Sequence, residues 1–227
     1  TFTRKAATEL SERISQRLDR LRVEGLWTQP PSEDGAAGLD TTATVSTYHA
    51  YAGRLVREHA VLLGHEPDAR LLTEAAAWQY AAEAVAAYDG PMDAMDRRES
   101  TVVAAVIQLS GELAEHLRGP QDALAEVTRV LTHVRSLPGT LPAGGPVGEL
   151  VANLELKAMV LPIVQAYAAL KRSRDVLDFA DQMALAARLA QEVPVVGEIE
   201  RSRFSVVLLD EFQDTSEAQM ELLRRLF

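Results

Sequence analysis

The residues best suited to chemistry lie near the end of the chain, in the segment DEFQDT. Asp210 and Glu211 directly follow the apolar run VVLL, and Gln213 and Asp214 come next after Phe212. Phe204–Leu209 is apolar on both faces, which predicts a buried central strand of a parallel sheet. Ligands of open α/β sheets lie beyond the carboxyl ends of the strands. Because Mg²⁺ prefers oxygen ligands and a neighbouring carboxylate can activate an attacking water, the segment predicts a magnesium–nucleotide site.

A simpler explanation exists for two adjacent acids, because strand ends meet solvent and are often charged. For the bare pair Asp210–Glu211 we would favour that explanation. The longer string fixes an amide and a third acid at set positions, and this favours a functional role.

Composition narrows the classes of protein that fit. The chain has 227 residues, 47% of them hydrophobic, and no cysteine, which excludes disulfides, thiolate catalysis and cysteine-ligated zinc. A net charge of −10 argues against one broad basic face for nucleic acid, although a narrow track of a few side chains stays open. No apolar run reaches membrane-spanning length, and the start lacks a signal-peptide layout. We therefore expect a cytoplasmic protein that does not bind membranes.

The hydrophobic periodicity predicts mixed α/β segments around a long helical block. We expect strands at Thr1–Thr3, 41–47 and 204–209, the last one leading into Asp210. The helices expected from three- and four-residue spacing of apolar residues cover 4–23, 48–64, about 68–88, about 97–118, 120–136, a long one from about 149, 175–193 and one after Ser216. Pro162 predicts a kink in the long helix, and Pro194 is expected to end the helix before it.

Four segments resemble motifs of one family, the UvrD/Rep/PcrA group of superfamily 1 DNA helicases with their RecB- and AddA-like relatives. VVLLDEFQDTSEAQ resembles motif II, TFTRKAATELSERI resembles motif Ia, and VSTYHAYAGRLV resembles motif Ib. RDVLDFADQM is similar to the segment usually written LDFDDLL, which follows the inserted helical domain of the family. The four segments occur in the family's order.

The resemblance implies a partial RecA-like (P-loop NTPase) domain 1A that is interrupted by a helical domain 1B. The expected fold class is therefore α/β with a mostly α-helical insertion. Residues 1–63 and 173–227 would belong to domain 1A, and residues 64–172 would form domain 1B. The helical block itself carries no diagnostic motif.

The resemblance also implies roles for individual residues. Asp210 would coordinate Mg²⁺, Glu211 would activate the hydrolytic water, and Gln213 and Asp214 would contribute to the ATP site. Single-stranded DNA, or a junction of single- and double-stranded DNA, would be bound by residues of motifs Ia and Ib, namely Phe2, Thr3, Arg4, Thr47, Tyr48 and His49. Aromatic faces stack on any base, and hydroxyl groups bind phosphate without reading sequence. For the larger protein, the resemblance further implies ATP-driven movement along single-stranded DNA in the 3′-to-5′ direction.

The sequence differs from the family pattern at three positions, and it lacks one family motif. Arg4 replaces the usual Asn, Tyr48 the usual Phe, and Ala180 an acid, which puts any role of that acid in doubt. No G-x-x-x-x-G-K-[ST] phosphate-binding loop occurs in the 227 residues. In the family this loop precedes motif Ia, so we expect the sequence to be part of a larger motor and to be inactive by itself.

Several alternatives remain open at this stage. The composition and the stretch before motif II are similar to actinobacterial motor–nuclease (AdnB-like) subunits, which makes a second such subunit a candidate partner. Lys171, Arg172 and Arg174 form a basic cluster that could touch a phosphate backbone or simply be a solvated helix end. The rival to a motor is a non-catalytic helical interaction module.

Overall fold

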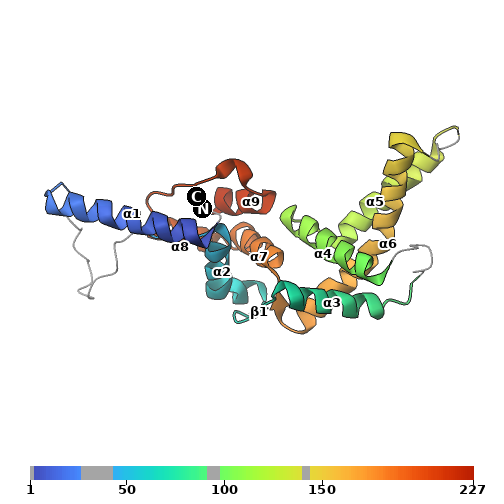
Figure 1. Cartoon of the computed structure of the whole chain (residues 1–227), viewed down its shortest axis with the longest axis horizontal. Coiled ribbons are helices and arrows are strands. Elements are labelled where there is room, and N and C mark those ends of the chain that lie inside the picture. The colour runs from blue at the N-terminus through green and yellow to red at the C-terminus, as the bar shows by residue number, and fades with distance from the viewer. Residues whose placement is uncertain (1–2, 27–42, 91–97, 140–143) are drawn as a thin grey trace.

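Helices dominate the computed structural model, which describes residues 3–26, 43–90, 98–139 and 144–227. Figure 1 shows an elongated molecule with α1 at one end, a central group of helices, and a second helical group at the other end. In chain order the elements are α1 (Arg4–Val23), α2 (Tyr48–His59), η1 (Ala60–Leu63), β1 (Arg70–Leu71), α3 (Glu74–Ala86), α4 (Glu99–Glu115), α5 (Pro120–Ser136), α6 (Gly145–Ser173), β2 (Val176–Leu177), α7 (Phe179–Glu192), α8 (Pro194–Arg203), η3 (Phe212–Asp214) and α9 (Glu217–Leu226).

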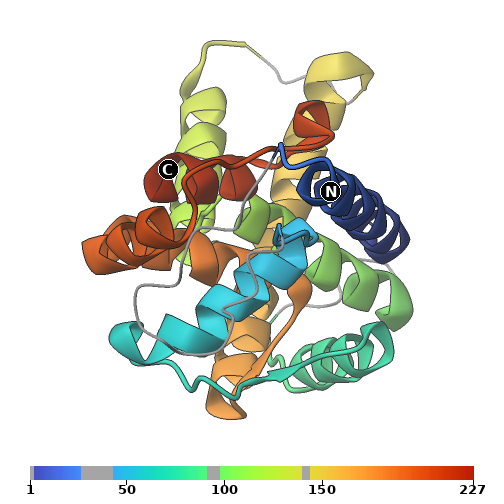
Figure 2. The ribbon, with the colours of Figure 1, turned by 90° about the vertical axis from the view of Figure 1, so that its left-hand side faces the viewer.

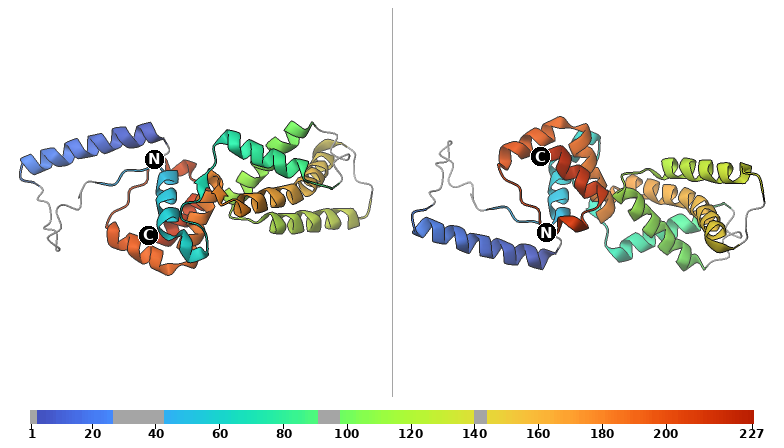
Figure 3. Two further views of the ribbon diagram at one scale, coloured as in Figure 1. Left: turned by 90° about the horizontal axis from the view of Figure 1, so that it is seen from below. Right: turned by 90° about the horizontal axis from the view of Figure 1, so that it is seen from above.

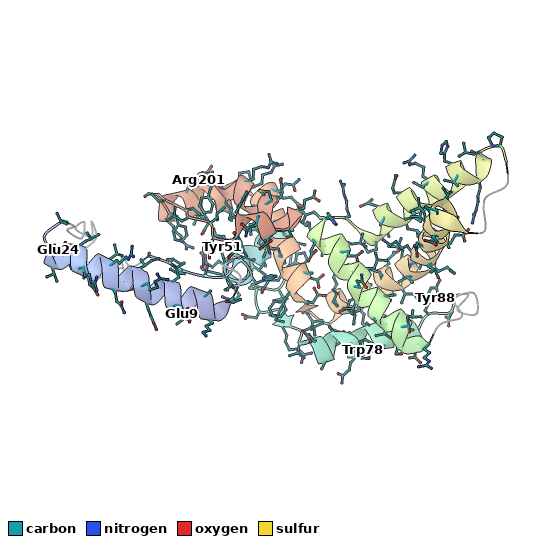
Figure 4. All side chains as sticks on the ribbon, turned by 45° about the horizontal axis from the view of Figure 1, so that its top comes forward. Glu9, Glu24, Tyr51, Trp78, Tyr88 and Arg201 are labelled. Carbon is teal, nitrogen blue, oxygen red and sulfur yellow. The ribbon has the colours of Figure 1, made fainter. Side chains whose placement is uncertain are left out.

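Helix α1 confirms the helix expected over 4–23 and extends away from the other helices (Figure 3). It begins at Thr3, whose side chain accepts a hydrogen bond from the Ala6 backbone N–H, so Thr3 caps a helix where a strand was expected. Its apolar stripe is not covered, since Leu10 is 36% and Leu21 is 39% exposed. Figure 4 shows the side chains between the labelled Glu9 and Glu24 without a helix packed against them.

The central group packs α2, α7, α8 and α9 around one apolar core. Leu55, Leu189 and Leu222 are each at most 1% exposed in this core, and they come from α2, α7 and α9. In Figure 2, α2 and α7 lie side by side. The helix expected over 48–64 is found as the α-helix α2, which ends at His59, followed by the 3-10 helix η1, which ends at Gly64 with φ of 73°. Glycine suits this left-handed position because it lacks a Cβ.

The second group packs α3, α4 and α6 around a separate core, and α5 lies along α6 (Figure 1). Helix α3 starts later than the sequence indicates, at Glu74, because the Thr73 side chain caps it by accepting from the Ala76 backbone N–H. Helix α6 runs without interruption through Pro162 over 29 residues. The kink expected at Pro162 stays a prediction.

Two boundaries near motif II differ from the sequence expectation. Helix α7 begins at Phe179, where Asp178 and Asp181 form a capping box, and residues before it form β2. Pro194 ends α7 as expected, yet it also starts the unpredicted helix α8. Proline is tolerated at the first helical position, since the backbone N–H there would have no partner within the helix. The helix after Ser216 is confirmed as α9, with the expected Ser216–Gln219 capping box.

The β-structure is where the sequence expectation was wrong. Within the described ranges, the only sheet is the parallel pair β1–β2, with Arg70 opposite Val176 and Leu71 opposite Leu177. Residues 43–47 and 204–209 contain no strand, and Val206 and Leu208 are 74% and 90% exposed. A strand needs a neighbour for its backbone hydrogen bonds, and no described strand lies beside these segments. Residues 1–2 of the expected first strand and residues 41–42 of the second lie outside the described part of the chain.

Among the described residues, no helix is both long enough and apolar enough to cross a membrane.

Candidate nucleotide-binding turn and adjoining groove

The segment that follows the extended residues 204–209 folds into a tight exposed turn. Glu211 has φ of 52°, a left-handed conformation that is uncommon for residues other than glycine, and η3 follows it directly. The Gln213 side-chain amide donates to a carboxylate oxygen of Glu211, and to Oδ2 of Asp214 at 3.4 Å. The Thr215 hydroxyl closes the turn by donating to the Phe212 carbonyl at 2.7 Å. The turn therefore gathers the predicted site residues in one place.

Helix α2 contacts this turn through Tyr48. The Tyr48 hydroxyl donates to the backbone carbonyl of Asp210 at 3.1 Å, although the two residues are 162 positions apart. Tyr48 is only 7% exposed. Burial raises the pKa of the Tyr48 hydroxyl, and the charge of Asp210 raises it further. This hydrogen bond therefore joins Tyr48, which was predicted to bind DNA, to Asp210, which was predicted to bind Mg²⁺.

The chemistry of the turn suits magnesium in part. In the part of the chain that the structure describes, the Asp210 carboxylate makes no hydrogen bond or ion pair, so it is available as an oxygen ligand. One or two carboxylates beside substrate phosphates are enough for Mg²⁺, which keeps several waters. Asp210 is not at the end of a paired strand, which corrects the sequence expectation. The residues fit the ion, whereas the phosphate-binding loop that would complete the site is not among the 227 residues.

A groove of about 600 Å³ opens on another side of the α2 N-terminus. His49 and Phe179 meet edge to face in it, with ring centroids 5.8 Å apart. Arg57 and Gln182 supply its polar groups. Burial lowers the pKa of His49, and the charge of Glu115 opposes this effect. The residues that line the groove come from α2, β1 and α7: Thr47, His49, Ala50, Gly53, Arg57, Leu71, Phe179 and Gln182.

The hydroxyl groups predicted to contact DNA are engaged in helix capping. Thr47 accepts a hydrogen bond from the Ala50 backbone N–H at 3.1 Å, and it is only 8% exposed. Thr3 caps α1 in the same way. Phe2 lies outside the described residues, and Arg4 begins α1. The structure thus brings Thr47, Tyr48 and His49 next to the 210–215 turn and the groove.

Phe179 and Gln182 are groove residues that the sequence reasoning did not assign to the site. The LDFADQ segment was noted as similar to a family motif, and this similarity was the signal that could have identified them. Periodicity alone could not, since it only places both residues on a helix.

A buried carboxylate fixes the helix that leads into the 204–209 segment. Glu200 of α8 is fully buried and accepts hydrogen bonds from Tyr51 at 2.7 Å and from Arg54 at 2.5 Å, both on α2. Arg203 pairs with it at 3.1 Å. Burial and the hydrogen bond to Glu200 raise the pKa of Tyr51. Figure 4 labels Tyr51 and, on α8, Arg201, whose side chain donates to the Leu226 carbonyl at 2.6 Å.

The same region contains a group of side chains that resembles a metal site. Among the described residues, Glu58, His59 and Glu200 bring ligand atoms within 4.8 Å of one another. Arg54 and Arg203 already pair with both carboxylates. Two guanidinium groups beside the same oxygens oppose a metal cation. We therefore interpret this cluster as an ion-pair network between α2 and α8.

The motif segments and their contacts define one class of protein. The model of the UvrD/REP helicase N-terminal domain matches residues 1–227, so the chain belongs to this family, as its motifs indicated. It is 25% identical, over an alignment of 235 residues, to the ATP-dependent DNA helicase UvrD1 of Mycobacterium leprae and to that of Mycobacterium bovis. It is 24% identical over 226 residues to the ATP-dependent DNA helicase PcrA of Staphylococcus aureus. All of this chain but only 23–24% of these relatives is covered, so the chain spans about a quarter of their length.

Proposed function

We propose that the chain forms part of an ATP-dependent DNA motor, with Asp210 holding Mg²⁺ and Glu211 activating the hydrolytic water. The observation that carries this proposal is the hydrogen bond from Tyr48 to the Asp210 carbonyl at 3.1 Å. It connects the helix that begins with motif Ib to the turn of motif II, so a shift on one side moves the other. Mg²⁺ would neutralise charge on the phosphates, while Gln213 would orient Glu211 through their hydrogen bond.

The groove beside α2 is our candidate for the single-stranded DNA track. His49 and Phe179 offer ring faces and edges for bases, and Arg57 offers a charge for a phosphate. Such contacts are independent of base sequence, as a translocating motor requires. A local groove of this kind is compatible with a net charge of −10. We propose 3′-to-5′ movement, and action at single- to double-stranded junctions, for the whole protein.

The proposed division into domains follows the two apolar cores. The core of α2, α7 and α9 would belong to domain 1A, over 1–63 and 173–227, and the core of α3, α4 and α6 to domain 1B, over 64–172. The exposed residues Val206 and Leu208 support a sheet completed by segments outside the 227 residues. Because the phosphate-binding loop is not in the sequence, we propose that these residues alone do not hydrolyse ATP.

The first experiment replaces Glu211 by Gln in the intact protein. DNA-stimulated ATP hydrolysis should fall about 100-fold or more, because a general base contributes this much, while binding of a fluorescent ATP analogue persists. Glu198→Gln, at an exposed position on α8, is the matched control and should leave hydrolysis unchanged. Normal ATP turnover by the Glu211 variant would disprove its role and would favour the rival, a non-catalytic helical interaction module.

A further inference from the structure

Lys171, at the end of α6, is a buried cation with two carboxylate partners. The residue is 2% exposed, and its Nζ lies 2.6 Å from Oδ2 of Asp178 and 2.6 Å from Oδ2 of Asp181. The Nζ also lies 4.4 Å from the ring centroid of Tyr167. The interpretation of Lys171 as part of a solvated basic cluster was therefore wrong. A buried charge is costly unless it is paired and hydrogen-bonded, and Lys171 meets this condition through α7.

The same two carboxylates define the first turn of α7. Oδ1 of Asp178 accepts from the Asp181 backbone N–H at 2.9 Å, and Oδ2 of Asp181 accepts from the Asp178 backbone N–H at 3.0 Å. Phe179 lies between the two acids in sequence, and Gln182 directly follows the second. Lys171 therefore stabilises the first turn of α7, from which Phe179 and Gln182 line the groove.

The pairing of β1 with β2 is a second connection between the helical group α3–α6 and the groove. The Arg70 backbone N–H donates to the Asp175 carbonyl at 3.0 Å, and the Leu72 N–H donates to the Leu177 carbonyl at 2.8 Å. Leu71, between these bonds, lines the groove. Both β1 and Lys171 thus connect the helical group α3–α6 with the N-terminus of α7, where Phe179 lines the groove.

We propose that Lys171 is a positioning residue for DNA binding, which couples the helical block to the groove through Asp178 and Asp181. This inference rests on the proposed role of the groove as a track for single-stranded DNA. The lysine itself does not touch the nucleic acid. If it served stability alone, its replacement would lower the melting temperature without changing the affinity of the folded protein for DNA.

Replacement of Lys171 by Met tests the proposal. Methionine keeps most of the volume but leaves the partly buried carboxylates of Asp178 and Asp181 without the cation between them, so their repulsion should displace the first turn of α7. The affinity of the intact protein for a short fluorescein-labelled oligothymidylate should fall about tenfold, which is in the usual range of coupling between sites. Lys157→Met, at an exposed position of the same helix, is the matched control.

A compensating variant separates positioning from stability. In K171M/D178N/D181N the repulsion is absent and the asparagines retain oxygen atoms for the capping box, so binding should recover relative to K171M. Equal oligothymidylate affinity of folded K171M and the unchanged protein would overturn the inference. Should K171M not fold, Asp181→Ala removes one partner of Lys171 together with its half of the capping box, and an unchanged affinity of that folded variant would overturn the inference equally. Failure of the unchanged protein to bind the oligonucleotide would instead contradict the proposed function.

Discussion

At the scale of single residues, the proposed site combines groups that the sequence identified with groups that it did not. Asp210 and Tyr48 were both expected from motifs, and the structure joins them directly. Phe179 and Lys171 were missed or misassigned, because their roles depend on a partner from another helix. A motif records which residue types occur together along the chain, whereas a buried ion pair or a ring contact is a property of the packed structure.

Histidine 49 gives a prediction about pH. Burial lowers its pKa in the folded protein, while in the unfolded chain it has the usual value of about 6.5. The unfolded state therefore binds the proton more readily, so His49 makes folding stability fall as pH drops through about 6.5. Glu115 opposes this effect without reversing it.

The measurement compares melting temperatures between about pH 7.5 and about pH 5.5. His49→Gln should lose less stability on acidification than the unchanged protein does. His133→Gln, at an exposed position on α5, controls for the removal of a histidine. Equal acid sensitivity of the His49 variant and the unchanged protein would contradict a lowered pKa of the partly buried His49.

At the scale of elements, local signals predicted helices well and strands poorly. Helix α1 was found at its predicted residues, and α9 began at its predicted capping box. Periodicity and caps act within a few residues, so they can be read from sequence. The strand expected over 204–209 was wrong, because an apolar run forms a strand only when a neighbouring strand pairs with it. The pair β1–β2 was missed, since two-residue strands carry no periodicity.

The junction of α2 and α8 shows how packing fixes the segment before motif II. Glu200→Gln should lower the free energy of unfolding by about 2 kcal/mol, because Arg54 and Arg203 would lose the buried charge between them. The shift in the midpoint of urea denaturation measures this loss. Glu192→Gln removes an exposed pair with Arg188 and should change the midpoint little. Similar midpoints for both variants would contradict a stabilising role of Glu200.

At the scale of the whole molecule, a run of consecutive apolar side chains, 206–209, is exposed where we propose that further structure packs. Leu208 is 90% exposed in an extended segment that pairs with no described strand. An unpaired apolar segment of this kind favours association with other chains. In the intact protein, by our proposal, the same side chain is enclosed in a sheet next to Asp210.

Replacing Leu208 by Asp distinguishes these two environments. In the separate 227-residue chain the change should leave the melting temperature within about 2 °C, because surface substitutions have small effects. It should also reduce any concentration-dependent increase in mass seen by sedimentation. In the intact protein, an unpaired carboxylate buried beside the proposed nucleotide site should abolish ATP hydrolysis. Val61→Asp, at a 63% exposed position of η1, should be tolerated in both settings. Full ATP hydrolysis by the intact Leu208 variant would mean that residues 204–209 do not form a buried strand there.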